Sequence, residues 1–267
     1  MPPAKKRPRA YDPAKTRSAV LAQFDHVHRA VVTLTPEQLE QPTRLGEWTV
    51  RELAAHVTMA MRSVIRGVAA PAPATRDLTL LEWPLATRRY AGDVDHDTRE
   101  IAEAGASDPA ALAALYEKTG RGLAEALEAP GDRLVVTRFG GVRLADFLVT
   151  RTVELIVHTD DLNDATGLAV PYERQALAAC TRLLADALAG KAPGGSVEVR
   201  VPPYAVVQCV EGPRHTRGTP PNVVETEPLT WIRLATGRTT WADALDAAQV
   251  RASGERADLS ALLPVLG

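Results

Sequence analysis

Three ionisable side chains in two short segments of the chain have the types needed to bind a metal ion. His56 lies in GEWTVRELAAHVTMAMRSVI, and Glu154 and His158 lie in LADFLVTRTVELIVHTDDL. Neutral imidazole and carboxylate are ligands of zinc, and three protein ligands leave a coordination position for water or substrate, as in catalytic zinc sites. The combination predicts a catalytic divalent-metal site, provided that the fold brings the two segments together.

The spacing of these residues also has simpler interpretations. A glutamate and a histidine four residues apart, such as Glu154 and His158, commonly form an ion pair on one helix. A single histidine on an apolar face, such as His56, is commonly a hydrogen-bonded core residue. Spacing alone leaves both interpretations open beside the metal site.

The second segment predicts a buried helix with ionisable groups on its inner face. At 100° per residue, five side chains fall in one narrow stripe: Phe147, Arg151, Glu154, His158 and Asp161. Leucines border the stripe on one side and valines on the other, which a face turned to solvent would not show. The stripe is therefore predicted to point into the protein, where charges persist only if they are paired or coordinated.

The first segment predicts a helix that carries His56 inward. Thr49 and Glu52 have the spacing of a capping box, so the helix is expected to begin just after Trp48. His56 then shares one face with Leu53 and other apolar residues. It is expected to face the interior of a helical bundle.

Patterns along the chain predict an α+β multidomain fold, in which a four-helix bundle precedes a smaller α/β domain. The domains are expected to span residues 12–170 and 171–267. A hairpin is expected within 129–144, with Gly140 and Gly141 at its turn. The expected helices are 13–34, 49–66, 82–104, 109–128, 142–165 and 172–189, and strands are expected at 196–201 and 205–210.

Composition excludes several classes of protein. The chain has 267 residues, 45% hydrophobic and 24% charged, as in ordinary globular proteins. A net charge of -2 argues against nucleic acid as the main partner, and no apolar run is long enough to cross a membrane. The basic first residues precede no leader-like apolar stretch, so a cytoplasmic location is expected. Cys180 and Cys209 are too few for a disulfide framework and are expected to be buried thiols.

The pairing of GEWTVRELAAHV with RTVELIVHTDDL resembles the actinobacterial mycothiol-dependent maleylpyruvate isomerase family. The ending EPLTWIRLATGRTTWADALDAAQVRASGERADLSALLPVL resembles the sterol-carrier-like domain that accompanies it. The resemblance implies a DinB-like four-helix bundle followed by a sterol-carrier-like α/β domain. It also implies that a divalent metal, usually zinc, is held by His56, Glu154 and His158.

The resemblance further implies the chemistry. Zinc stabilises the thiolate of mycothiol, a low-molecular-weight thiol, and the thiolate is the nucleophilic form. In the family's named reaction the thiolate adds to a conjugated double bond, the new single bond rotates, and elimination of the thiol gives the trans isomer. Other members resemble thiol S-transferases. The expected partners are therefore a thiol and a small electrophile, and the identity of the electrophile stays open.

Further polar residues are candidates for supporting roles. Arg151 and Asp161 are expected either to orient a ligand imidazole and bind a substrate carboxylate, or to form structural ion pairs within the helix. Arg233 and Arg238 are expected either to reach an interdomain cleft and bind an anionic thiol or acid, or to be surface residues. His28 is a conceivable further ligand, although a core or rim position is favoured.

The second domain supports a rival hypothesis. Sterol-carrier-like folds can enclose apolar ligands, so the chain could be a lipid-binding or small-molecule-binding protein without turnover. Trp231 and Trp241 are clustered there, although tryptophans at such spacing are more often core residues than ligand walls. A purely structural metal is disfavoured, because three ligands leave an open position.

Overall fold

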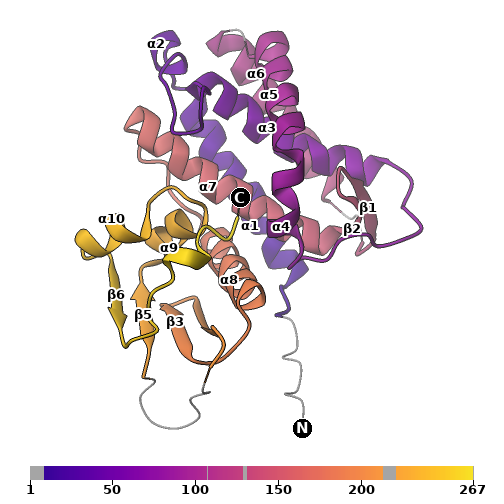
Figure 1. Ribbon diagram of the computed structural model, residues 1–267. Coiled ribbons are helices and arrows are strands. Elements are labelled where there is room, and N and C mark those ends of the chain that lie inside the picture. Colours follow the sequence, from indigo (N-terminus) through magenta and orange to yellow (C-terminus); the bar gives the residue numbers. More distant parts are fainter. Residues whose placement is uncertain (1–8, 107, 129–130, 213–220, 267) are drawn as a thin grey trace.

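Four long helices form a bundle in the N-terminal part of the chain (Figure 1). These are α1 (Pro13–Val31), α3 (Val50–Ala69), α6 (Pro109–Ala126) and α7 (Leu144–Thr166). Both α3 and α1 contact α6 and α7, so the four helices enclose one core. The short helix α2 (Pro36–Leu39) precedes α3. The computed structural model describes residues 9–106, 108–128, 131–212 and 221–266.

Local sequence signals place the ends of these helices. The carboxylate of Asp12 accepts hydrogen bonds from the backbone at the start of α1. The backbone N–H of Thr49 donates to Glu52 at 2.8 Å, so α3 begins at Val50, as the capping box predicts. Gly167 ends α7 in the left-handed conformation, with φ of 70°, where a residue without Cβ is favoured.

Helix α7 is shared between two hydrophobic cores. Leu148 and Leu155 pack into the bundle core, whereas Val153 and Ile156 pack into a second core with the C-terminal domain. The leucines and valines that border the polar stripe thus have different partners. Because both flanks are covered, the stripe between them lies at the junction of the bundle and the second domain.

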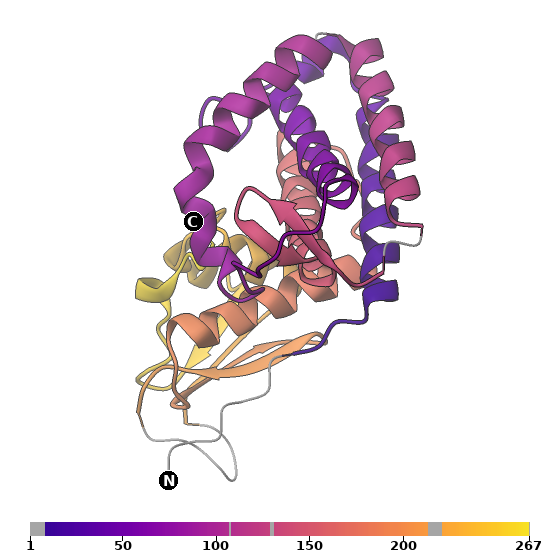
Figure 2. The ribbon, with the colours of Figure 1, turned by 90° about the vertical axis from the view of Figure 1, so that its right-hand side faces the viewer.

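The C-terminal domain contains α8 (Arg174–Lys191) and a four-stranded sheet in the order β4-β3-β5-β6. Strand β3 pairs antiparallel with β4 and parallel with β5, and β5 pairs antiparallel with β6. Helix α8 contacts α7 on one side and β4 on the other, and so lies between bundle and sheet (Figure 2). The strands are β3 (Val197–Val201), β4 (Ala205–Cys209), β5 (Val223–Thr226) and β6 (Val250–Ser253).

The inner face of this sheet is apolar and covered by helices. Val199 of β3 is buried opposite Val207 of β4 and Val224 of β5. Helix α9 (Pro228–Ala235) packs against α8 and inserts Trp231, which is 1% exposed. The remaining elements of the C-terminal domain are α10 (Trp241–Asp246) and the 3-10 helix η2 (Ser260–Leu262).

The expected helix 82–104 is broken into α4 (Trp83–Ala86), the 3-10 helix η1 (Thr87–Tyr90) and α5 (Ala91–Gly105). Trp83 packs into the core that includes the C-terminal domain, whereas Ala102 of α5 packs into the bundle core. One straight helix could not serve both partners. The chain therefore changes direction around η1.

The hairpin forms as expected, but its glycines do not lie at the turn. Strand β1 (Leu134–Thr137) pairs with β2 (Gly140–Arg143), so Gly140 and Gly141 begin the second strand. A Cβ on Gly141 would lie 2.0 Å from the carbonyl oxygen of Thr75. The glycines thus allow the loop around Thr75 to pack directly against the hairpin.

Other expectations from the sequence are met. The helical bundle and the smaller domain that contains the sheet agree with the expected α+β class. Cys180 and Cys209 are buried and unpaired with each other. Among the described residues, no helix is long and apolar enough to cross a membrane. Residues 1–8 of the basic first segment lie outside the described residues.

Candidate metal centre and cavity

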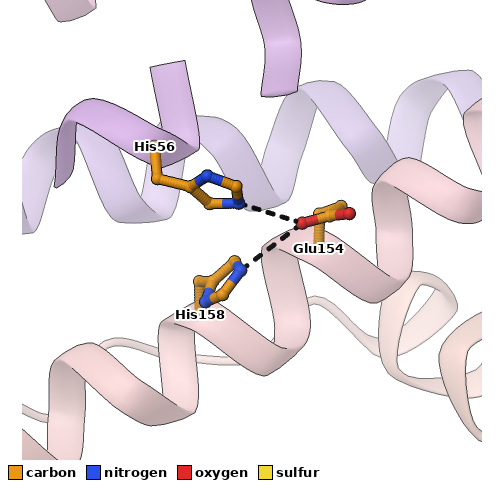
Figure 3. Close-up of side chains that lie close together, drawn as sticks. All are labelled: His56, Glu154 and His158. Carbon is orange, nitrogen blue, oxygen red and sulfur yellow. Dashed lines mark hydrogen bonds and ion pairs between the residues drawn. The ribbon is translucent and has the colours of Figure 1, made fainter. Parts of the chain in front are cut away.

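The structure brings His56 of α3 together with Glu154 and His158 of α7 (Figure 3). One potential ligand atom from each lies within 4.8 Å of the other two. The Oε2 of Glu154 is 3.3 Å from His56 Nε2 and 3.4 Å from His158 Nε2. The two imidazole rings meet edge to face, with centroids 4.7 Å apart. Their Nε2 atoms converge on one carboxylate oxygen.

The orientation of His158 is set by Asp161. The Oδ2 of Asp161 accepts a hydrogen bond from His158 Nδ1 at 2.9 Å. Because an ionised carboxylate only accepts hydrogen bonds, Nδ1 carries the proton. The other ring nitrogen, Nε2, therefore faces Glu154 and is the atom free to act as a ligand when the ring is neutral.

His56 is held by a residue of another helix. Its Nδ1 lies 3.2 Å from the hydroxyl of Thr98 on α5, a side chain with no exposed area. The indole of Trp48, just before α3, lies over the same ring at a centroid distance of 5.1 Å. The Nε1 of Trp48 donates to Asp95 of α5 at 2.6 Å. Helix α5 thus fixes both the imidazole and the aromatic ring beside it.

Arg151 lies one turn before Glu154 on the same stripe. Its Nη2 is 3.5 Å from Glu154 Oε1, the oxygen that the histidines do not contact. The guanidinium also lies over the ring of Phe147, 4.6 Å from its centroid. Burial lowers the pKa of Arg151, yet an arginine remains charged. Arg151 therefore places a buried positive charge directly beside the three potential ligands.

The pKa values of the three residues reflect their mutual contacts. Burial raises the pKa of Glu154, but the hydrogen bonds from His158 and His56 outweigh it and hold that pKa well below its usual range. Burial lowers the pKa of His158, but hydrogen bonds to Asp161 and Glu154 outweigh it, and the pKa is raised. Burial lowers the pKa of His56. Without a metal, these contacts favour the anionic form of Glu154, and they favour protonation of His158 more than that of His56.

Behind the histidines, arginines of both domains hold the carboxylates of Asp160 and Asp161. Arg238 binds Asp161 with two hydrogen bonds, of 3.1 and 2.8 Å, and Arg233 binds Asp160 with two, of 2.9 and 2.7 Å. Arg44, from the loop before α3, contacts both carboxylates. These contacts join α7 to the C-terminal domain. Burial raises the pKa of Asp161, but the hydrogen bonds from His158 and Arg238 outweigh it and hold that pKa well below its usual range.

The three potential ligands lie at the wall of a cavity of about 750 Å³. Helix α3, the segment from η1 to α5, the hairpin and α7 form most of its wall, and the C-terminal domain contributes Thr236, Arg238 and Leu266. Arg151 also lines this cavity. The site is thus accessible from a space large enough for a small molecule, and that space is bounded by both parts of the chain.

The remaining candidate residues differ in position. Arg238 lines the cavity, but its guanidinium is engaged by Asp161. Arg233 is engaged by Asp160 and does not line that cavity. His28 packs near Tyr116 and is not among the three clustered ligands.

Sequence reasoning missed several residues of this neighbourhood. Thr98 and Asp95 lie in a polar stretch of the chain that gives no sign of contact with His56 or Trp48. Arg44 lies in a loop. The doubled aspartate at 160 and 161, one turn beyond His158, was the available signal for a charged network.

Comparison with known proteins gives the family. A family model described as the mycothiol maleylpyruvate isomerase N-terminal domain matches residues 20–163, more than half of the chain. The chain belongs to this family. A second model, described as a bacterial SCP ortholog, matches residues 173–265. The family and the sterol-carrier-like domain that the sequence predicts are both confirmed. Membership of this family also confirms the prediction that the chain is an enzyme.

Solved structures of the same family share the fold. The crystal structure of the mycothiol-dependent maleylpyruvate isomerase has a TM-score of 0.60 at 17% identity, covering 93% of this chain and 95% of that one. A variant of that isomerase with one histidine changed to alanine has a TM-score of 0.61 at 15% identity, with the same coverage. No curated protein matches the chain significantly. At these identities the structural likeness concerns the fold alone.

The rival hypothesis of a lipid carrier is not favoured. The large cavity is lined mostly by the N-terminal part of the chain and lies beside the three clustered ligands, rather than within the C-terminal domain. Between the sheet and its helices, the domain is filled by buried side chains such as Trp231, Leu183 and Val199. Trp231 is a core residue there, and the Nε1 of its indole donates to the backbone of Thr181 at 3.3 Å.

Proposed function

We propose that this member of the family is a zinc-dependent enzyme that activates a low-molecular-weight thiol, mycothiol, for addition or transfer to an electrophile. The observation that carries the proposal is the convergence of His56, Glu154 and His158 at the wall of a cavity. We infer that the thiol and the electrophile meet in that cavity. A reduced cytoplasmic environment suits such thiol chemistry.

The three residues fit a divalent metal by their chemistry. Two imidazole nitrogens and one carboxylate oxygen are a common donor set for zinc with an open coordination position. Both imidazoles make a second hydrogen bond from Nδ1, to Asp161 and to Thr98, as metal-ligating histidines usually do. When bound, zinc would supply a Lewis-acidic centre that favours the nucleophilic thiolate at neutral pH.

The residues around the site can support an anionic reactant. Arg151 adds a buried positive charge beside Glu154 and is one of the residues that line the cavity. Asp161 keeps the proton of His158 on Nδ1 and thereby keeps Nε2 directed at the site. Phe147 and Trp48 line the cavity next to the polar residues and exclude water from part of it. Where water is excluded, the local dielectric constant is lower, and nearby positive charges stabilise a thiolate more strongly.

The family to which the chain belongs suggests the reaction class. Addition of the thiolate to a conjugated double bond forms a carbon–sulfur bond and leaves a single bond that can rotate. Elimination then breaks the carbon–sulfur bond and regenerates the thiol, so the net result is cis–trans isomerisation. Where no elimination follows, protonation of the adduct gives a thioether. In a displacement, the thiolate forms the carbon–sulfur bond while the bond to a leaving group on the electrophile breaks, and that group departs with the electron pair. Isomerisation of a maleylpyruvate-like acid is one form of this chemistry.

Replacement of one proposed ligand tests the function. His158→Ala removes one imidazole and leaves the Glu154 carboxylate with one histidine partner. We expect zinc content to fall from one per chain to near zero and thiol-dependent activity to fall with it. Folding should be largely kept, because α7 retains its leucine and valine contacts on both flanks. Zinc content, activity with mycothiol and thermal unfolding measure these three effects.

A matched control is His96→Ala, which removes an exposed histidine from α5, near Thr98 in the sequence. It should keep full zinc and full activity. If His158→Ala also kept both, the ligand assignment would be wrong. If it lost folding altogether, the metal would be structural and the proposed enzyme would lose its main support.

A further inference from the structure

The cavity extends as a groove along α3, away from the three clustered ligands. Its lining residues on α3 recur at every third or fourth position and therefore form one stripe. The first of them is His56 and the last, just beyond the helix, is Ala70; at 1.5 Å per residue they are about 20 Å apart. The stripe consists of His56, Met59, Ala60, Ser63, Arg66, Gly67 and Ala70.

The middle of the groove is walled by apolar side chains. Met59 and Ala60 of α3 face it together with Val94 of α5. Across the groove, the ring of Phe139 at the hairpin turn packs edge to face on Tyr90 of η1, with centroids 5.0 Å apart. A ligand that displaces water from this stretch gains free energy only if the part lying there is apolar.

The end of the groove away from the ligands is positively charged. Arg66 of α3 lies at this end, and Arg88 of η1 and Arg138 of the hairpin turn also line the cavity. Arg138 is close enough to both Arg66 and Arg151 to lower the pKa of each. Arg138 is paired with Asp97 at 2.9 Å, whereas no ion pair to Arg66 or Arg88 occurs among the described residues. Partial burial and the positive charges of Arg62 and Arg138 lower the pKa of Arg66, against the opposing effect of Asp97. An anionic group would be stabilised there.

The hairpin approaches α3 closely because of one glycine. A Cβ on Gly67 would lie 2.9 Å from the carbonyl oxygen of Val136. The side chain of Val136 is 44% exposed although it lines the cavity, so an apolar surface is left for a ligand to cover. The shape of this end of the groove is therefore built by the contact between hairpin and helix.

We propose that the electrophile is an elongated amphipathic acid, with an apolar body and an anionic terminus. This inference rests on the proposed function and specifies its second substrate. The reactive carbon lies near Glu154, the apolar body lies along Met59 and Phe139, and the anionic group contacts Arg66 and Arg88. Ten residues of α3 separate His56 from Arg66, so the molecule spans about 15 Å. A small diacid would leave the apolar walls in contact with water.

Binding of simple carboxylates tests the inference without any thiol reaction. The probes are acetate, hexanoate and decanoate, with maleate as a small diacid and 1-decanol as a neutral chain. Calorimetric titration uses the full chain without metal, so that direct binding of a carboxylate to zinc makes no contribution. Affinity should rise roughly two- to fourfold for each added methylene group. Decanoate should bind more tightly than either 1-decanol or maleate.

Substitution of the arginines locates the anionic terminus. Arg66→Ala should weaken decanoate binding about tenfold or more and leave 1-decanol unchanged, because a charged hydrogen bond is lost while the apolar walls remain. Arg88→Ala should act in the same direction. The matched control is Arg89→Ala, which removes the adjacent exposed arginine of η1 that does not line the cavity. It should leave both affinities unchanged.

The possible results separate this inference from the proposed function. Affinity independent of chain length, tighter binding of maleate than of decanoate, or equal effects of Arg66→Ala and Arg89→Ala would each overturn the inference. Thiol-dependent activity could still be present in those cases, and the proposed function would stand. Conversely, the protein could show the expected binding pattern but no thiol-dependent activity. In that case the inference about the ligand of the groove would stand, and the proposed reaction would be wrong.

Discussion

The Nδ1 of His158 donates to the Oδ2 of Asp161 at 2.9 Å, three residues further along the same helix. Asp161 has no exposed side-chain area, and Arg238 and Arg44 hold its carboxylate from the C-terminal domain and from the loop before α3. The orientation of a proposed metal ligand on α7 therefore depends on residues from three separate parts of the chain.

Asp161→Asn should weaken zinc binding by about 10- to 100-fold. The amide keeps nearly the same shape but loses the negative charge, and its NH2 group would face the donor groups of Arg238 or His158. A chelator competition assay measures the affinity. Asp164→Asn is the control, because Asp164 lies on the same helix but is half exposed, and its contact with Arg44 is long, at 3.9 Å. Equal affinities in the two variants would show that Asp161 does not support the ligand.

Zinc binding should be pH-dependent and should release a proton. Asp161 and Glu154 raise the pKa of His158 despite the opposing effect of burial, so the metal-free ring is protonated at a pH where an ordinary histidine is neutral. A ligand must lose this proton, and affinity should therefore rise with pH and level off above the raised pKa. Titration calorimetry in buffers of different ionisation enthalpy counts the released protons. Affinity that is constant between about pH 5.5 and 8.5 would contradict the proton exchange.

Arg238→Ala should lower the free energy of unfolding by about 2 to 3 kcal/mol, because it leaves the buried Asp161 carboxylate with one arginine fewer. The loss should stay below that of a fully broken buried pair, since Arg44 still contacts Asp161. Denaturant unfolding measures the difference. Arg251→Ala, on the exposed side of β6, should change stability by less than about 0.5 kcal/mol. Comparable losses in both variants would argue against the pairing.

Gly67→Ala should destabilise the protein by about 1 to 2 kcal/mol, although alanine is the better helix former. Its Cβ would meet the backbone oxygen of Val136, so the hairpin would have to move. Gly190→Ala in α8 is the matched control, because its Cβ would meet nothing within 4 Å, and it should stabilise by about 0.5 kcal/mol. Thermal unfolding of both variants shows whether each substitution raises or lowers stability. Stabilisation by Gly67→Ala would show that the hairpin can move away from α3 at little cost in free energy.

Local periodicity was enough to predict much of α7 and α3. The stripe on α7 and its apolar flanks follow from the turn of a helix, so the alignment of Glu154 with His158 is determined by the sequence alone. The start of α3 followed in the same way from Thr49 and Glu52. Such inferences succeed because the residues involved lie within one or two turns of each other, where helix geometry fixes their relative positions.

Contacts between distant segments could not be obtained in this way. His56 and Glu154 are 98 residues apart, and only the packing of α3 against α7 brings their side chains together. The sequence left Asp161 and Arg238 with several roles, and the fold joined them to each other. The approach of Arg138 to Arg66 in the wall of the cavity likewise depends on the hairpin reaching α3. The helical period determines which side of a helix a residue occupies. The residue that it contacts across an interface is decided by how the helices, the hairpin and the second domain pack against one another.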